Sequence, residues 1–206
     1  NIFNIIKKYK KSDAIITDIG STKQNIINIL KLTIAEHEEC FIGSHPLTGK
    51  ETSTIMAYEK NLFDKAVVLV TPTEKTKKNL VKKVSRFWKA MKCKVTMISP
   101  KLHDLVLSET SHLPHLVSFA LVNIILNTQS IKNIKDYTGG GFRDFARLAH
   151  SDGVMWNDIC GTNEKNIVTS INMLIKELGL IKNMVKSNDK SLRLYLSGIK
   201  AKLDKK

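Results

Sequence analysis

Two short runs of β-forming residues, Ala66-Val67-Val68-Leu69-Val70 and Val95-Thr96-Met97-Ile98, enclose the segment Asn79–Met91. In that segment apolar side chains recur at the 3.6-residue period of a helix, at Leu80, Val81, Val84, Phe87, Trp88 and Met91. The lysines between them are expected to face solvent. A strand, a helix and a second strand in this order are typical of parallel strands joined by a crossover helix. The stretch therefore predicts an α/β fold for the first half of the chain.

The same alternation extends toward the amino terminus. Ala14–Thr17 and Cys40–Gly43 are further short apolar runs, and the segment between them has helical character. We therefore predict that residues 1–98 form part of a Rossmann-like domain with a parallel sheet. After Pro100 the pattern changes to long helical segments without strand candidates, so residues 99–206 are predicted to form an all-helical domain. The predicted fold class is α/β followed by all-α.

The longest apolar segment of the chain runs from Leu102 to Leu126 and contains Pro114. Because proline lacks an N–H group and its ring crowds the preceding turn, we expect a kink or a free carbonyl near Thr110. No uninterrupted apolar run approaches the roughly 18 residues that a membrane helix needs. The start, Asn1-Ile2-Phe3-Asn4, resembles neither a signal peptide nor a Met start, so we expect a soluble chain whose first residue is internal.

The formal net charge is +14, from 33 Lys and Arg against 19 Asp and Glu. The lysines are spread along the chain with few aromatic residues between them, which favours solvated helix faces over nucleic-acid binding. A positive field would still attract anionic substrates. Cys40, Cys93 and Cys160 form no Cys-x-x-Cys pair, so the sequence predicts a reduced, cytoplasmic setting. Cys40 and Cys93 adjoin apolar runs, and we expect both to be buried.

Four motifs contain the candidate functional residues: Asp18-Ile19-Gly20-Ser21-Thr22-Lys23, Ser44-His45-Pro46-Leu47-Thr48-Gly49-Lys50-Glu51, Ser111-His112-Leu113-Pro114-His115 and Gly139-Gly140-Gly141-Phe142-Arg143-Asp144. In order and approximate spacing they resemble the motif set of the bacterial prephenate dehydrogenase family, over residues from about 14 to 182. The family opens with a Gly-rich dinucleotide loop that nothing in this chain matches. The resemblance implies that residues 1–98 are the later part of a dinucleotide-binding domain. It also implies that residues 99–206 bind substrate and form a homodimer.

His45 is the candidate catalytic base. It follows the predicted strand Cys40–Gly43, which would place it at the carboxyl edge of the sheet, where ligands of open α/β folds bind. Its imidazole can accept a proton near neutral pH. A His-Pro pair taken alone would more often be an ordinary turn, and it is the resemblance of the whole motif that favours the base. The resemblance also implies that Ser21 contacts both this histidine and the nicotinamide end of the cofactor, although Ser21 or Thr22 could instead cap the following helix.

The other candidates would hold the substrate. Arg143 can grip a carboxylate with two parallel hydrogen bonds, and glycines 139–141 could take positive φ and deliver it to a ligand, although an Arg–Asp surface pair at a helix start is the alternative. The resemblance implies that His115 donates a hydrogen bond to a substrate carboxylate, that His112 supports the structure, and that Glu51 joins a polar network at the pocket entrance. Lys50 precedes Glu51 where relatives commonly have a small hydroxyl residue. His103 and Asp104 could add metal ligands to the two motif histidines, but we predict no metal site.

The resemblance implies oxidative decarboxylation of prephenate to 4-hydroxyphenylpyruvate with NAD, or with NADP, in tyrosine biosynthesis. An arogenate dehydrogenase is the alternative within the class. A catalytically incompetent fragment that serves only as a helical dimerisation module is the alternative from another class.

Overall fold

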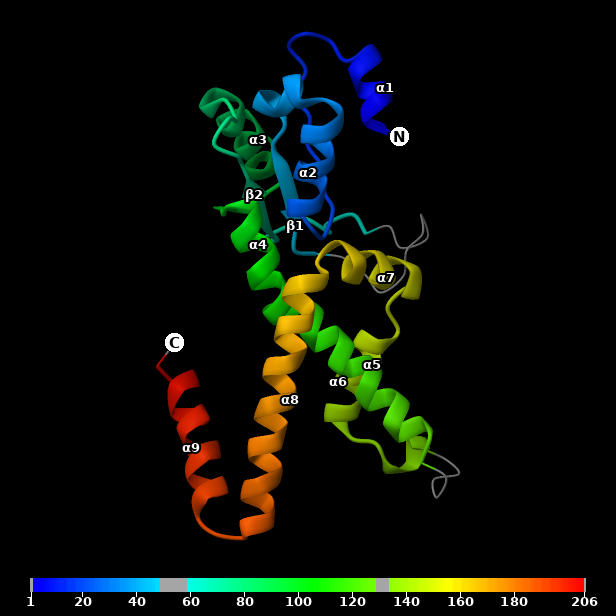
Figure 1. Cartoon of the computed structure of the whole chain (residues 1–206), viewed down its shortest axis with the longest axis vertical. Helices are drawn as coiled ribbons and strands as arrows, with labels where there is room; N and C mark the ends of the chain where they lie inside the picture. The colour runs from blue at the N-terminus through cyan, green and yellow to red at the C-terminus, as the bar shows by residue number, and fades with distance from the viewer. Residues whose placement is uncertain (1, 49–58, 129–133, 206) are drawn as a thin grey trace. The chain divides into compact units, whose positions relative to one another are not determined.

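The computed structural model describes residues 2–48, 59–128 and 134–205 (Figure 1). They form two compact units, Asn1–Ile167 and Val168–Lys206. The boundary predicted at residues 98 and 99 lies inside the first unit and stays a prediction. The α/β portion followed by helices agrees with the predicted fold class.

A three-stranded sheet in the order β1-β2-β3 forms the centre of the α/β portion, with β1 at Gly43–Pro46, β2 at Val67–Thr71 and β3 at Lys94–Met97. Helix α3, Lys78–Ala90, joins β2 to β3, and these two strands are parallel, as predicted. Strand β1 is antiparallel to β2, so the sheet is mixed and the prediction of parallel pairing throughout was wrong.

Of the two amino-terminal strand predictions, the first was too long and the second was placed too early in the chain. Residues 14–17 contribute only one parallel bridge, between Ile16 and Phe41. The 3-10 helix η1, Ala35–Cys40, occupies the start of the second predicted run, and β1 begins only at Gly43. The main-chain hydrogen bonds of Ile42 and Ser44 to Ile16 and Asp18 nevertheless continue this parallel pairing toward β1. His45 consequently lies inside a strand and not after one.

Two apolar clusters cover the two faces of this sheet region, because the neighbours Phe41 and Ile42 point in opposite directions along an extended chain. One cluster is built by Ile42, Val68, Val70, Val84, Trp88 and Cys93. The other combines α1, Ile2–Tyr9, and α2, Gln24–Thr33, through Phe3, Ile27, Leu30, Ile34 and Phe41. Figure 1 shows α2 and α3 on opposite sides of the strands. Cys40 and Cys93 are buried as predicted, whereas Phe87, predicted to face the core, is 55% exposed.

The rest of the first unit is helical. Its elements are α4 (Pro100–Leu107), the π-helical turn η3 (Ser108–His112), α5 (Leu113–Leu126), η4 (Ile134–Tyr137), α6 (Gly140–Ala149), α7 (Gly153–Thr162) and the start of α8 (Glu164–Ser187). Ser99 caps α4 by accepting a hydrogen bond from the Leu102 N–H. The disturbance expected from Pro114 takes the form of the π turn, and the proline lies in the first turn of α5, where its missing N–H is tolerated.

The continuous helical run Pro100–Leu126 is long and apolar enough to cross a membrane by length and composition alone. Core helices of soluble proteins pass the same test. The sequence predicted no such span, because charged and polar residues interrupt the run, and several of them are buried in the site described below.

The second unit is a helical hairpin. The later part of α8 is followed by α9, Ser191–Leu203, which runs back alongside it (Figure 1). The Tyr195 hydroxyl donates a hydrogen bond to Glu177 and links the two helices. Many apolar side chains of this unit are exposed, among them Met173, Ile175, Leu178, Val185, Leu194, Leu196, Ile199 and Leu203.

Candidate active site

His45 is held by a strand that packs very closely against its neighbour. A Cβ atom on Gly43 would lie 2.3 Å from Thr71 Oγ1, so only glycine permits this approach of β1 to β2. The next side chain, Ser44, is buried and accepts a hydrogen bond of 3.0 Å from Trp88 Nε1. Because side chains alternate along a strand, the His45 ring lies on the face opposite Ser44, toward α4.

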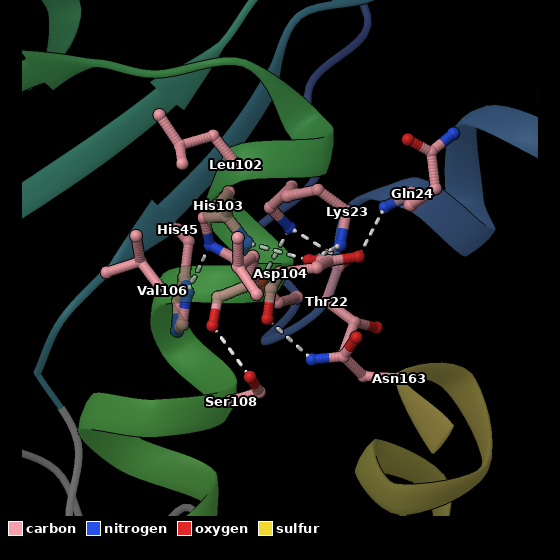
Figure 2. A network of polar contacts seen from close by, with 12 residues as sticks. Thr22, Lys23, Gln24, His45, Leu102, His103, Asp104, Val106, Ser108 and Asn163 are labelled. Carbon is pink, nitrogen blue, oxygen red and sulfur yellow. Dashed lines mark hydrogen bonds and ion pairs between the residues drawn. The ribbon is translucent and has the colours of Figure 1, made fainter. Parts of the chain in front are cut away.

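The His45 ring begins a chain of polar contacts that crosses three elements (Figure 2). Its Nδ1 lies 2.8 Å from His103 Nε2 on α4, and His103 Nδ1 lies 2.8 Å from Asp104 Oδ1. The Asp104 carboxylate also accepts hydrogen bonds of 2.8 Å from the backbone N–H groups of Lys23 and Gln24, at the start of α2. His103 is 0% and Asp104 1% exposed, so this series of polar contacts is shielded from solvent.

The carboxylate of Asp104 is the cap of α2. The sequence offered Ser21 or Thr22 as caps, but the helix begins at Gln24 and no side-chain cap comes from its own N-cap residue, Lys23. Instead the acceptor comes from a helix about eighty residues later in the sequence. The partial positive charge at the N-terminus of α2 stabilises this carboxylate. Sequence reasoning considered His103 and Asp104 only as metal ligands and missed this role. Among the described residues no group of three or more His, Cys, Asp or Glu could hold a metal.

A cavity of about 570 Å³ lies beside the His45 ring. Its lining includes His45, Ser111, His115, Arg147 and Trp156, so it joins β1 to three helices and the π turn. The His115 ring is stacked on the Trp156 indole, with centroids 4.2 Å apart and planes inclined by 27°. The structure therefore brings the predicted residues His45 and His115 to one cavity.

The tautomer of His115 follows from its backbone contact. Its Nδ1 lies 2.9 Å from the carbonyl oxygen of Ser111, which can only accept. Nδ1 therefore carries a proton, and Nε2 of the neutral ring is an acceptor. A hydrogen bond from Nε2 to a carboxylate, which the resemblance implies, requires the imidazolium form.

The arginine in the cavity is Arg147 and not Arg143. Both residues belong to α6 and both are exposed, but Arg143 lies outside the cavity lining. The predicted flexible glycine loop is also absent: Gly139 is the N-cap of α6 with φ −98°, and none of the described glycines has a positive φ. The sequence singled out the arginine nearest the glycines, whereas one turn further along the helix another reaches the pocket.

Ser21 lines a neighbouring cavity of about 570 Å³ together with Gly20, Thr22, Asp152 and Met155. Met155 also lines the His45 cavity, so the two spaces share a wall. Glu51 and Lys50 lie outside the described residues.

The Ser21 loop is fixed by a fully buried ammonium group. Lys23 Nζ lies 2.6 Å from Asp18 Oδ2 and donates to the Gly20 and Thr22 carbonyl oxygens at 2.5 and 3.2 Å. The hydroxyl of Thr22 in turn donates to Thr162 on α7 at 2.9 Å. These contacts hold the loop at the mouth of the Ser21 cavity.

Burial keeps two histidines of the site neutral. It is the main cause that lowers the pKa of His45 to about 3, and the nearby basic groups His103 and Lys23 add to it. Burial likewise lowers the pKa of His112 to about 4; this residue is 1% exposed and contacts Asn163 Nδ2 at 3.3 Å. A neutral His45 has a lone pair available for a proton at physiological pH, as a general base requires.

We expect the protein to lose stability as the pH falls below 6.5. In the unfolded chain both histidines take up a proton near their usual pKa of 6.5, whereas in the folded chain they stay neutral until about pH 3 to 4. Since the unfolded state then binds more protons, each histidine should cost about 2 kcal/mol of unfolding free energy at pH 5 relative to pH 7.5. Urea unfolding at these two pH values measures the loss. A His112→Asn variant should lose less on acidification, and the exposed His150→Asn variant should behave like wild type. Equal stability at both pH values would contradict the prediction.

Two family models match the chain: "Prephenate dehydrogenase, nucleotide-binding domain" over residues 1–97, and "Prephenate dehydrogenase, dimerization domain" over residues 99–197. A prephenate dehydrogenase of Bacillus subtilis is 33% identical over 178 residues, which are 86% of this chain and 48% of that protein. A cyclohexadienyl dehydrogenase of Zymomonas mobilis is 30% identical over 87% of this chain and 61% of its own length. The chain thus spans about half to three fifths of these relatives.

Solved structures show the same likeness. The prephenate dehydrogenase of Aquifex aeolicus, in complex with hydroxyphenyl propionate and NAD+, is 36% identical with a TM-score of 0.88, and the match covers 99% of this chain and 71% of that one. An arogenate dehydrogenase of Synechocystis shares the fold, with a TM-score of 0.82 at 24% identity over 99% of this chain and 73% of that one.

Proposed function

The chain belongs to the prephenate dehydrogenase family, and we propose that it supplies the proton-accepting and substrate-binding groups for oxidative decarboxylation of prephenate to 4-hydroxyphenylpyruvate with NAD in tyrosine biosynthesis. The observation that carries the proposal is one cavity lined by His45, His115 and Arg147. It combines a neutral base with an anion-binding group, which is what oxidation of a hydroxylated dicarboxylic acid requires.

The Nε2 atom of His45 would accept the proton of the substrate's ring hydroxyl as the hydride leaves the carbon that bears this hydroxyl. Loss of the ring carboxylate as carbon dioxide then makes the ring aromatic, which drives the reaction forward. Arg147 would hold a substrate carboxylate through two parallel hydrogen bonds, and an imidazolium at His115 would donate one more. These residues supply orientation and proton transfer and form no covalent bond to the substrate.

When bound, NAD supplies the hydride acceptor. The Ser21 cavity fits its nicotinamide end, since a hydroxyl and the backbone of Gly20 line a space that shares a wall with the His45 cavity. No segment of the 206 residues has the Gly-x-Gly-x-x-Gly pattern that cradles a pyrophosphate. The residue that would select NAD over NADP belongs to that part of the fold, so NADP remains the alternative.

Two alternatives are distinguished by substrate and by cofactor. Arogenate carries an amino group in place of the keto oxygen, and comparing both substrates at equal concentration separates the two dehydrogenases. The name of the Zymomonas relative, cyclohexadienyl dehydrogenase, supports testing both. A chain that serves only as a helical dimerisation module would bind neither substrate nor cofactor.

Ligand binding can be followed through tryptophan fluorescence, because the chain has two tryptophans and only Trp156 lines the cavity. Trp88 is 3% exposed in the core of the α/β portion. In a Trp88→Phe variant we expect 4-hydroxyphenylpyruvate to change the fluorescence of Trp156 with saturation below about 1 mM. Trp156→Phe, which keeps Trp88, should show no change.

A parallel titration with NADH, followed by the fluorescence of its nicotinamide, tests the cofactor half. Binding of both ligands supports the dehydrogenase, and a response to neither would leave the helical module as the function. A response to the aromatic acid alone would assign to this chain the substrate half of the site.

We further propose that the protein is a homodimer in the cytoplasm. The matched dimerization model and the exposed apolar side chains of the helical hairpin support the dimer. Sedimentation at several protein concentrations measures it directly. The three cysteines, free in the structure, support a reducing compartment.

A further inference from the structure

We propose that Asp104 is a positioning residue that acts through His103 to hold His45 in the tautomer with a proton on Nδ1 and a free lone pair on Nε2. This inference rests on the proposed role of His45 as the base. The contacts that carry it are the two distances of 2.8 Å that link the three side chains in series (Figure 2).

The direction of the hydrogen bonds follows from the last group in the series, the carboxylate of Asp104. A carboxylate can only accept, so His103 Nδ1 must be the donor toward Asp104 Oδ1. In a neutral His103 ring Nε2 is then an acceptor, and the only proton available for the 2.8 Å contact is the one on His45 Nδ1. The remaining nitrogen of His45, Nε2, keeps its lone pair for the cavity.

Asp104 is held in place by more than its histidine. Burial alone would raise the pKa of this carboxyl, but hydrogen bonds from His103, Gln24 and Lys23 together hold it below its usual value, so it stays ionised. Its backbone carbonyl accepts a further hydrogen bond of 2.8 Å from Asn163 Nδ2. The carboxylate of Asp104 is therefore held by the start of α2, and its backbone is held by the α7–α8 junction.

One carboxylate thus orients two parts of the site. Its backbone donors, Lys23 and Gln24, directly follow the loop that carries Ser21, while its imidazole partner orients His45. When His45 Nε2 takes a proton, the ring becomes a cation. The Nδ1–H bond to His103 then strengthens, and the negative charge of Asp104 stabilises the cation through the intervening ring, as in Ser-His-Asp enzymes.

An Asp104→Asn variant tests the assignment sharply, because an amide has one acceptor where three donors converge. Either orientation of the amide sets an N–H group against a backbone N–H. When the NH₂ group faces His103, that ring must accept at Nδ1 and carry its proton on Nε2. His103 then donates to His45 Nδ1, and the proton of His45 moves to Nε2. A His103→Phe variant removes the link without changing the cap of α2.

The tautomers can be read from imidazole ¹⁵N shifts by NMR on the 206-residue chain, which needs no turnover. We expect the Nδ1–H tautomer of His45 in wild type and the Nε2–H tautomer in His103→Phe, with a mixture or the Nε2–H form in Asp104→Asn. Asp13→Asn, an exposed carboxylate, is the matched control and should leave the His45 signals unchanged. In turnover assays kcat should fall at least about tenfold in both site variants, with KM within about twofold.

An Nε2–H tautomer of His45 in wild type, or an unchanged Nδ1–H tautomer in a folded His103→Phe variant, would overturn the proposal. Should Asp104→Asn fail to fold, His103→Phe still decides. Failure of the proposed function gives a different result: the tautomer shifts would follow this pattern while neither substrate nor NADH binds.

Discussion

His45→Asn is expected to lower kcat about 1000-fold while KM stays within about twofold, because a positioned general base contributes about 10²- to 10⁴-fold. Asparagine has a similar reach and can still donate to His103 Nε2, so the contact at 2.8 Å can persist. What the variant loses is a nitrogen lone pair that can accept the hydroxyl proton. Prephenate-dependent NADH formation gives both constants, and the tryptophan titration gives binding independently.

Two results would contradict this role. An equal loss in turnover and in binding would mean that His45 holds the substrate and does not accept its proton. An unchanged kcat would remove His45 from the chemistry altogether. The matched control is His150→Asn, an exposed histidine at the C-cap of α6 that lies outside the cavity lining, and it should retain wild-type kcat.

Arg147→Ala is expected to weaken binding of prephenate and of 4-hydroxyphenylpyruvate about 100-fold, the equivalent of about 2.7 kcal/mol. The guanidinium is the cationic group of α6 that lines the cavity, and its loss removes a charge-assisted pair of hydrogen bonds. Arg147→Lys should recover only part of the affinity, since an ammonium offers a point charge where a carboxylate prefers two parallel donors.

Arg143→Ala is the matched control, because it removes the same charge from the same helix. We expect its affinity to stay within about threefold of wild type, since Arg143 lies outside the cavity lining. A larger loss in Arg143→Ala than in Arg147→Ala would restore the assignment that the sequence suggested. Similar losses in both would point to the net charge of the region and not to a contact.

The two arginines show how far the sequence predicts this site. Residues 143 and 147 are four apart, so both lie on one face of α6, and the need for a guanidinium from this helix could be predicted. Which turn of the helix faces the cavity depends on how α6 packs against α5, and no local pattern records that. The sheet gave a similar result: the β2-α3-β3 unit followed from local periodicity, whereas the antiparallel pairing of β1 depends on residues far away in sequence.

The contacts of Asp104 lay beyond sequence reasoning for a related reason. A helix start usually finds its cap within its own turn, and Ser21 and Thr22 satisfied that expectation. The cap of α2 instead comes from α4, so its detection requires the folded arrangement. His103 and Asp104 carry no motif of their own beyond being adjacent, and only the distances give them a role.

The π turn at Ser108–His112 sets the angular phase of everything that follows it on the same helical rod. His103 and His115 are twelve positions apart, which in an unbroken α-helix would set them about 120° apart around the axis. A π turn absorbs one additional residue, and this reduces the angle to about 20°. The one additional residue in the π turn thus aligns His103, which contacts the base His45, with His115, which lines the cavity. Deleting one residue of the π turn would rotate His115 by about 100° around the helix axis relative to His103 and turn it away from the pocket.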